Sequence, residues 1–390
     1  MSAENKNLQE IMQNIFSARR SVKETVLFME KGDVKNLLFP IDRVESVTSY
    51  DGSVTYTEGV DYVVEDGGLK VTETSAIPCI TAETFYHQPD SIIRAVDPAT
   101  GERTPIFWGE GKVKAWQVSV TYTHTSPWEG YVQRSYAEVY ARLLQKLDAG
   151  EDVTVCFYGD SITWGANSSF QENAEPRQGS YAMLFTRALA DLYGYTVKYV
   201  DVLTEVGGLN FARVPDTDYA GGERGTITYV NAAIGGWSSR HGVEYFDSTL
   251  GPMVEKYGCD LLVTAFGMND GCFLPDETRD NTRAIVDALL AKAPDASVLP
   301  VSSMTPHTGT DWDHPSIAQQ EAQLERLAED YRRDGIPCAV ACVHSVSKAV
   351  QERKDFRDYT GNNVNHPNDW FYRVYAQTLL QTVVGYEHIL

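Results

Sequence analysis

The sequence lacks the features of a disulfide-stabilised, secreted or membrane-spanning protein. None of its six cysteines forms a C-x-x-C pair, so we expect reduced core thiols and no structural zinc site. No apolar run approaches the roughly 20 residues that a membrane-spanning helix needs. The first residues contain no basic segment followed by an apolar one, so we expect no secretory signal and a cytoplasmic location.

Positive charge is also scarce. The 390 residues contain 33 Lys and Arg against 54 Asp and Glu, which gives a net charge of −21, and no block of like charges stands out. Such a surface repels phosphate backbones and anionic lipids. We therefore expect neither nucleic acid nor membrane partners. The charge favours a neutral or cationic ligand, and we expect a small-molecule or oligosaccharide ester substrate. The oligomeric state stays open.

Two compositional regimes divide the chain. Residues from about 20 to 125 are rich in Val, Thr and Tyr, with frequent turn signals such as Glu65-Asp66-Gly67-Gly68, a pattern typical of an all-β sandwich. We predict a β-rich accessory domain at 1–130, a connecting helix within 131–150 and an α/β domain at 151–390.

Strands and helices are predicted to alternate in the third segment, which is typical of a parallel sheet covered by helices on both faces. The expected strands are Val153–Tyr158, Val197–Val202, Ile227–Val230, Leu261–Phe266, Val298–Val301 and Cys338–Val343. The expected helices lie at about 180–193, 243–257, 279–292, 315–333 and Asp369–Val384.

Four short segments are rich in glycine or in polar side chains, and three of them follow predicted strands. Ligands of such sheets bind beyond the carboxyl ends of the strands. Alone, the first and third segments are explained equally well by a capping serine and an Asx turn, and the second and fourth are explained better by a tight turn and a structural histidine. The segments are Gly159-Asp160-Ser161, Gly235-Gly236-Trp237, Gly267-Met268-Asn269-Asp270 and Asn362-Asn363-Val364-Asn365-His366-Pro367.

Together the four segments supply the parts of an acyl-transfer site. That chemistry needs a nucleophile, a base that takes its proton, and donors for the developing oxyanion. Ser161 and His366 are the candidate nucleophile and base, and the Gly236 N–H and the Asn269 side chain are the candidate donors. No metal or organic cofactor is needed for this chemistry.

These residues, in this order, resemble the four sequence blocks of the SGNH (GDSL-type) hydrolases over about residues 150–390. The resemblance implies a three-layer α/β/α fold. It also implies Ser161 as nucleophile, His366 as base, and the Ser161 N–H, Gly236 N–H and Asn269 side chain as the oxyanion hole.

One position departs from the family pattern, which usually has Asp three residues before the histidine. This chain has Asn363 there, and an amide cannot stabilise imidazolium by charge. Three outcomes stay open: a backbone carbonyl orients His366, another acid such as Asp355 or Asp358 replaces the missing one, or the enzyme is slow. Asp369 is expected to cap the last helix instead.

The substrate is expected to be an acetylated oligosaccharide. Trp164, Trp237 and Asp160 are the candidate substrate-binding residues, with Asp160 also suited to holding its loop through backbone N–H groups. A β-sandwich before an SGNH domain resembles the two-domain carbohydrate acetylesterases. For the N-terminal domain, two roles stay open: it binds glycan, or it completes one wall of the site. The candidates for such a wall are Trp108, Trp116 and Trp128.

Three alternatives stay open. A lysophospholipase or thioesterase would need an extended apolar channel. The second alternative is a glycan-binding protein without activity, and Asn363 is the only residue that supports it. A metal-dependent hydrolase would use His307, His314, Asp311 and Asp313, whose spacing is poor for ligation.

Overall fold

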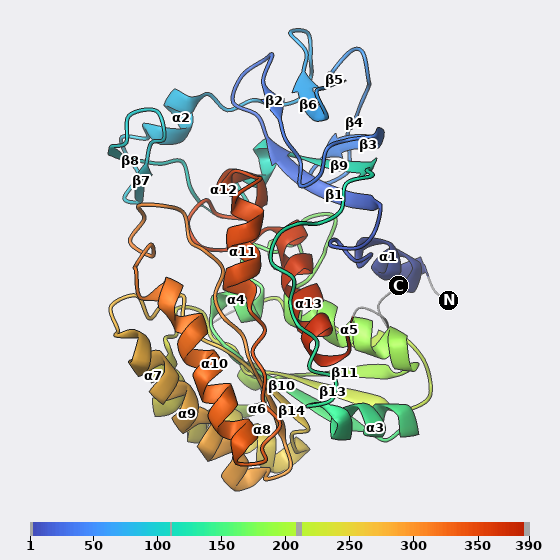
Figure 1. Ribbon diagram of the computed structural model, residues 1–390, viewed down its shortest axis with the longest axis vertical. Coiled ribbons are helices and arrows are strands. Elements are labelled where there is room, and N and C mark those ends of the chain that lie inside the picture. The colour runs from blue at the N-terminus through green and yellow to red at the C-terminus, as the bar shows by residue number, and fades with distance from the viewer. Residues whose placement is uncertain (1–2, 110, 208–212, 386–390) are drawn as a thin grey trace.

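A six-stranded sheet forms the centre of the C-terminal part of the chain (Figure 1). The structure is a computed structural model that describes residues 3–109, 111–207 and 213–385. The strand order is β12-β11-β13-β10-β14-β15, and β12 alone pairs antiparallel. The strands are β10 (Val153–Gly159), β11 (Thr196–Asp201), β12 (Tyr219–Ala220), β13 (Thr226–Asn231), β14 (Leu261–Ala265) and β15 (Ser297–Pro300).

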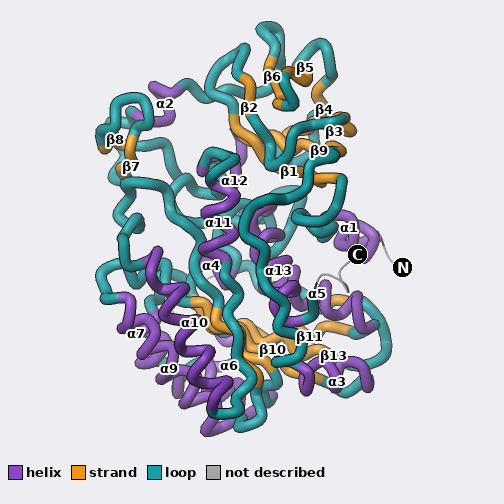
Figure 2. The backbone as a smooth tube through the Cα atoms, in the orientation of Figure 1, coloured by secondary structure: helices purple, strands orange, loops and turns teal. Residues whose placement is uncertain are grey.

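Helices cover both faces of this sheet, so the predicted three-layer α/β/α fold is confirmed (Figure 2). The central strand β10 is buried along its whole length, as expected for a strand covered on both sides. The side chains of Val155 and Phe157 join one hydrophobic cluster, and those of Cys156 and Tyr158 join another. This alternation follows from the two-residue period of a strand.

The first of these clusters includes residues of α3 (Ala141–Ala149), α5 (Tyr181–Tyr193), α11 (Val343–Gln351) and α13 (Asp369–Val383). The second includes residues of α6 (Val202–Val206), α8 (Leu250–Tyr257), α9 (Pro275–Lys292) and α10 (Ile317–Arg333). Shorter helical turns are α4 (Ser161–Trp164), α7 (Ser239–Glu244), η2 (Phe246–Ser248) and α12 (Phe356–Tyr359).

The segment 338–343 differs from its prediction as a full strand. It runs beside β15 but makes only isolated bridges, between Val298 and Cys338 and between Val301 and Ala341. Pro300, the last residue of β15, lies between the bridged positions Val298 and Val301 and has no N–H to donate. A continuous ladder is therefore interrupted there.

The N-terminal region, residues 3–130, is strand-rich as predicted. Its largest sheet has the order β1-β9-β3-β4, with β1 (Arg20–Leu27), β3 (Arg43–Ser49), β4 (Thr55–Tyr56) and β9 (Gln117–Thr123). Two smaller sheets contain β2 (Val34–Lys35), β5 (Tyr62–Glu65) and β6 (Gly68–Val71), and β7 (Arg94–Val96) and β8 (Arg103–Pro105). Its helical segments are α1 (Ala3–Ile11), α2 (Ala82–Tyr86) and η1 (Lys114–Trp116).

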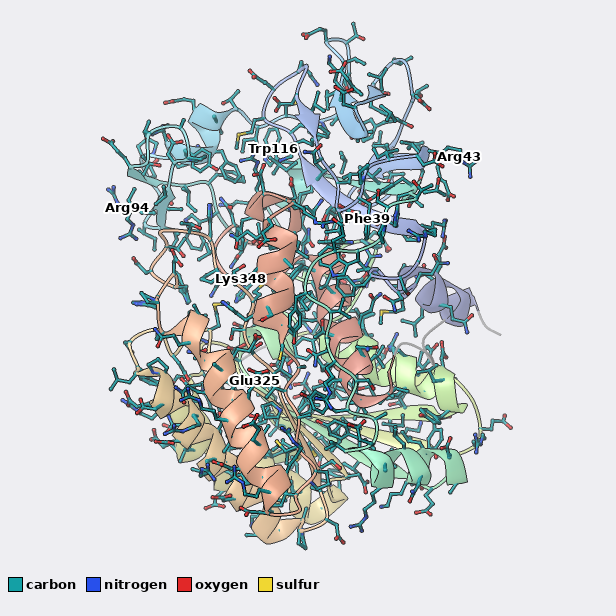
Figure 3. All side chains as sticks on the ribbon, viewed as in Figure 1. Phe39, Arg43, Arg94, Trp116, Glu325 and Lys348 are labelled. Atoms are coloured by element: carbon teal, nitrogen blue, oxygen red, sulfur yellow. The ribbon has the colours of Figure 1, made fainter. Side chains whose placement is uncertain are left out.

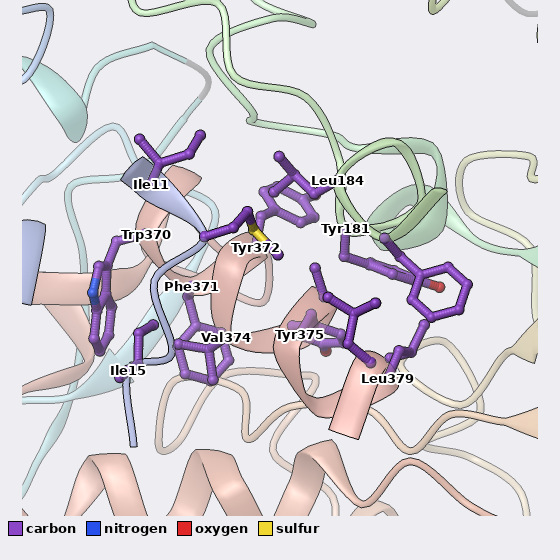
Figure 4. Packing of buried hydrophobic residues seen from close by; sticks show 14 of the residues in the cluster. Ile11, Ile15, Tyr181, Leu184, Trp370, Phe371, Tyr372, Val374, Tyr375 and Leu379 are labelled. Atoms are coloured by element: carbon purple, nitrogen blue, oxygen red, sulfur yellow. The ribbon is translucent and has the colours of Figure 1, made fainter. Parts of the chain in front are cut away.

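The N-terminal region packs directly on the α/β region, residues 151–385. Ile11 and Ile15 lie against the buried face of α13, as Figure 4 shows. A separate cluster joins Leu27 of β1 to Val364, and Trp116, labelled in Figure 3, packs against it. The two regions therefore share hydrophobic cores.

Buried charges also cross this junction. Lys354 donates to Glu24 at 2.7 Å, and both side chains have no exposed surface. Arg373 of α13 donates to the carbonyl oxygens of Val22 and Lys23, at 2.7 and 2.8 Å.

Within the described residues, no helix is long and apolar enough to cross a bilayer.

Candidate active site

The carboxyl ends of three neighbouring strands bring three of the four motifs together. Gly159 pairs with Ala265 of β14, and its carbonyl accepts the N–H of Ile234, at 3.0 Å, just beyond β13. Ser161 begins α4 two residues after Gly159, and Gly236 lies two residues after Ile234. The parallel register of the sheet therefore places these loops at one edge.

The fourth motif reaches this edge through its histidine. Ser161 Oγ lies 2.8 Å from His366 Nε2, although the two residues are 205 positions apart. This is hydrogen-bond distance for a nucleophile and its base. The structure therefore brings the predicted nucleophile and base into direct contact.

The other ring nitrogen of His366 contacts amides. His366 Nδ1 lies 2.6 Å from Asn167 Oδ1 and 3.1 Å from Asn362 Nδ2. Asn167 Nδ2 donates to Glu172 Oε1 at 3.0 Å. Because a carboxylate only accepts hydrogen bonds, it fixes the Asn167 amide with its oxygen toward the ring. Nδ1 then carries the proton, and Nε2 is free to accept the Ser161 proton.

The acids and the amide considered at the sequence level are turned away from the imidazole. Asn363 donates to the carbonyl of Phe107 at 2.7 Å and does not contact His366. Asp358 accepts the N–H of Leu27 at 2.8 Å, and Asp355 pairs with Lys35 and Arg357. Within the described residues, no backbone carbonyl forms a hydrogen bond with the His366 ring. The side-chain oxygen of Asn167 contacts the ring nitrogen Nδ1 instead.

Asp369 was predicted to cap α13, but the structure shows another residue in that position. Asn368 is the N-cap, and its side-chain oxygen accepts the N–H of Phe371 at 3.2 Å. Asp369 is the first helical residue, and its carboxylate accepts the N–H of Ser169 at 2.8 Å. Asp369 therefore helps to hold the loop that also carries Asn167.

Burial keeps the imidazole of His366 neutral. It lowers the pKa of His366 to about 4, because removal from water penalises the charged form. The contacts recorded for the ring, with Ser161, Asn167 and Asn362, are all to uncharged groups. At neutral pH His366 is therefore in the form that accepts a proton.

The three candidate oxyanion donors lie on the loops around Ser161. The Ser161 N–H is in the first turn of α4, where amides have no acceptor within the helix. Gly236 is exposed and has a φ of +77°, in the left-handed region that favours glycine. Asn269 Nδ2 donates one hydrogen to the carbonyl of Trp237 at 3.0 Å. Its second amide hydrogen remains for a ligand.

Asp160 does not belong with the substrate-binding residues. Its side chain is only 2% exposed and accepts the N–H of Ile162 at 2.9 Å, as the N-cap of α4. Burial raises the pKa of Asp160 to about 7. Asp160 therefore holds the turn that presents Ser161.

The tryptophans divide into partly exposed and buried ones. Trp164 and Trp237 are partly exposed, and the Trp237 ring stacks on Tyr245 with 5.2 Å between centroids. Trp108 is 36% exposed on a loop that bonds to the His366 loop through Phe107 and Gly109. Trp128 is buried and cannot line the site. Trp116 is a packing residue of the junction.

The residues of the metal-hydrolase alternative are engaged elsewhere. His307 is buried with Nδ1 2.9 Å from the carbonyl of Asn363, and Asp311 pairs with Arg103 at 2.8 Å. Asp313 accepts the N–H of Gly309. Across residues 3–109, 111–207 and 213–385, no group of three or more His, Cys, Asp or Glu side chains is arranged to hold a metal ion.

Sequence reasoning missed Asn167. It follows α4 by three residues and adopts a left-handed φ of 63°, a conformation that asparagine tolerates better than most residues. The run Gly165-Ala166-Asn167 signals a turn but not the direction of the amide. Its contact with His366 depends on a loop 199 residues away in the chain.

More than half of the chain is similar to a known protein family. Residues 157–374, more than half of the chain, match the GDSL-like Lipase/Acylhydrolase family. No curated protein matches the sequence.

Among solved structures, a two-domain esterase (CEX) active on acetylated mannans, co-crystallised with mannopentaose, aligns with 64% of this chain at 18% identity and a TM-score of 0.43. This alignment covers 54% of that esterase, so the matched part spans about half of its length. A carbohydrate esterase of family 3 from Talaromyces cellulolyticus aligns with 58% of this chain and 94% of its own, at 14% identity and a TM-score of 0.38. Such distant likenesses carry no argument about substrate.

The matched range includes Ser161, Gly236, Asn269 and His366, and the sheet that presents them belongs to the three-layer α/β/α fold that the family resemblance implied. The chain belongs to the GDSL-like lipase/acylhydrolase family.

Proposed function

We propose that this protein is a serine esterase that removes O-acetyl groups from carbohydrates through an acetyl-Ser161 intermediate. The observation that carries the proposal is the 2.8 Å contact between Ser161 Oγ and His366 Nε2. The Nδ1 proton of His366 bonds to the Asn167 amide oxygen, so the free lone pair is on Nε2.

In the first half of the reaction, Ser161 Oγ attacks the acetyl carbonyl and His366 Nε2 takes the hydroxyl proton. The negative charge that develops on the carbonyl oxygen is stabilised by the Ser161 N–H, the Gly236 N–H and the Asn269 amide. The carbon–oxygen bond to the sugar then breaks, and His366 returns the proton to the sugar oxygen.

In the second half, water attacks the acetyl-serine. His366 takes a proton from that water, and the carbon–Oγ bond breaks. Ser161 recovers its hydroxyl proton from His366 and acetate leaves. The base is needed twice, so its tautomer matters in both steps.

A large apolar hollow bears on the size of the acyl group. An apolar hollow of 660 Å³ is lined by residues of α1, by Leu192 at the end of α5 and by Leu380 of α13. Leu380 lies eleven residues beyond the start of α13, which is about 16 Å along the helix. Ser161 is not among the residues that line this hollow, so the hollow does not by itself indicate a long-chain acyl group.

Aromatic side chains support a carbohydrate leaving group. Trp237 follows Gly236, and Trp312 Nε1 lies 3.4 Å from Asn269 Oδ1, so both rings flank the donors. Both are partly exposed, and flat apolar faces beside amides suit sugar rings. The activity on acetylated mannans belongs to the two-domain esterase, and the proposal for this chain stands on its own residues.

The test is acetate release from acetylated xylo- and manno-oligosaccharides, measured beside hydrolysis of p-nitrophenyl acetate and p-nitrophenyl palmitate. We expect acetate release and p-nitrophenyl acetate hydrolysis, with little turnover of the palmitate. Turnover confined to long-chain esters would contradict the acetyl specificity. No turnover of any ester would contradict the esterase itself.

A further inference from the structure

A buried ion pair stands behind the amide that contacts His366. Lys114 Nζ of η1 lies 2.8 Å from Glu172 Oε2, and the two side chains are 6% and 13% exposed. Glu172 Oε1 accepts hydrogen bonds from Asn167 Nδ2 at 3.0 Å and from the Gly111 N–H at 2.9 Å. Glu172 is thus bound on one side by the N-terminal region and on the other by the active-site loop.

The amide of Asn167 needs such a partner because it could otherwise turn over. With its NH2 group toward His366, the amide would favour the tautomer with the proton on Nε2, and that tautomer cannot accept the Ser161 proton. Asn362 favours this unproductive tautomer, because its Nδ2 is a donor and lies 3.1 Å from His366 Nδ1. The Asn362 amide cannot turn, because its Oδ1 accepts three backbone N–H groups, from Val364, Asn365 and His366.

Glu172 decides between the two tautomers. A carboxylate accepts hydrogen bonds and cannot donate one, so it holds only the NH2 end of Asn167. The amide oxygen must then face His366, at 2.6 Å. A proton on Nε2 would leave two acceptors, Nδ1 and Oδ1, in contact at that distance.

We propose that Glu172 and Lys114 are positioning residues of the esterase: together they lock the Asn167 amide and so select the reactive tautomer of His366. This inference rests on the proposed function. Lys114 belongs to the N-terminal region, which therefore acts on the base of the α/β region through Glu172 and Asn167.

Other groups hold the same loop. Lys114 lies over the ring of Tyr50, 5.4 Å from its centroid, and the Tyr50 hydroxyl accepts the N–H of Asp369 at 3.0 Å. The Asp369 carboxylate in turn accepts the Ser169 N–H. Tyr372 of α13 also reaches this loop, where its hydroxyl donates to the Ala166 carbonyl at 2.7 Å. Among the described residues, Lys114, Tyr50, Asp369 and Tyr372 are therefore ionisable groups from other elements that face this loop.

The first test replaces the carboxylate by an amide of the same size. Gln can donate or accept, so Glu172→Gln removes the preference for one orientation of Asn167. We expect kcat for p-nitrophenyl acetate to fall about tenfold or more, with KM nearly unchanged, as for residues that orient a reacting group. Glu175→Gln is the matched control, because Glu175 is in the same loop with its side chain 63% exposed.

The second test changes the amide itself. Asn167→Asp alone would place two carboxylates in contact and should lower kcat further. Asn167→Asp combined with Glu172→Gln lets the new amide donate to the new carboxylate, which then faces His366. We expect this pair to recover kcat above either single variant. The acid limb of its pH–rate profile should move to higher pH, because a carboxylate favours imidazolium.

The deciding readout is ¹⁵N NMR of histidine-labelled protein, with His366→Gln used for assignment. In the wild type the neutral His366 ring should carry its proton on Nδ1, and in Glu172→Gln a fraction should move to Nε2. Lys114→Met should shift the balance the same way and serves if Glu172→Gln does not fold.

The outcomes separate the two proposals. A wild-type proton on Nε2, or an unchanged tautomer and kcat in both variants, would overturn the positioning role even if the esterase is active. A tautomer shift in a protein without esterase activity would support the positioning role and reject the proposed function.

Discussion

The two regions of the molecule contribute to one site in different ways. The α/β region supplies every proposed reacting group: Ser161, His366 and the oxyanion donors all follow its strands or precede α13. The N-terminal region supplies contacts to the loops that carry them, through Lys114 to Glu172 and through Phe107 to Asn363. The chemistry is therefore local to the sheet edge, whereas its geometry depends on both regions.

The largest effect should come from the reacting groups. Ser161→Ala removes the nucleophile, and we expect the rate of p-nitrophenyl acetate hydrolysis to fall by about 10⁴-fold or more. The small change in volume should leave thermal melting near that of the wild type. Ser248→Ala, an exposed serine of η2, is the matched control, and retained activity in Ser161→Ala would remove that residue from the mechanism.

Breaking a buried ion pair at the junction between the two regions should lower the stability of the protein. Lys354→Met leaves Glu24 as an unpaired charge with no exposed surface, so we expect the free energy of unfolding to fall by about 3–5 kcal/mol. Urea unfolding measures this loss. Lys348→Met, at an exposed position of α11, is the control. A variant as stable as the wild type would mean that the regions do not depend on this pair.

The pH dependence tests the electrostatics of the base. Because the pKa of His366 is lowered to about 4, kcat/KM should hold nearly constant from pH 7 to about pH 5 and fall by half near pH 4. His366 also binds fewer protons in the folded than in the unfolded protein between about pH 6.5 and pH 4. Its contribution therefore lowers stability as the pH falls through this window. A fall in kcat/KM centred near pH 6.5 would contradict the conclusion that His366 lies in a buried environment of uncharged groups.

The smallest effects should come from the tryptophans, one from each region. Trp237→Ala and Trp108→Ala should each raise KM for acetylated oligosaccharides by severalfold, since stacking on one aromatic face is worth about 1 kcal/mol. Hydrolysis of p-nitrophenyl acetate is the control and should change little. If only Trp237→Ala has an effect, the N-terminal region does not line the sugar site.

Much of the fold can be predicted from the sequence. Polar motifs at strand ends and the alternation of strands and helices can both be recognised from neighbouring residues. Ser161 and Asn269 could be recognised because each follows an apolar strand, and their meeting follows from the parallel register. His366 joined them because acyl transfer needs a base, and the family resemblance implied the same role. The cap of α13 was misassigned by one residue, since Asn368 and Asp369 are both good caps.

The second contact of His366 could not be predicted in this way. Asn167, Glu172 and Lys114 come from two separate segments, and their link depends on which way an amide points across a loop. Asn363 was the natural candidate because of its spacing from His366. Its left-handed φ of 64° and its bond to Phe107 turn it toward the N-terminal region instead.

The central claim is that Ser161 forms the covalent intermediate with His366 as its base. Intact-protein and peptide mass spectrometry after reaction with a fluorophosphonate tests it most directly. The account predicts one adduct, on Ser161, which forms much more slowly in His366→Ala and is absent in Ser161→Ala. An unlabelled wild-type protein, or an adduct on another residue, would contradict it.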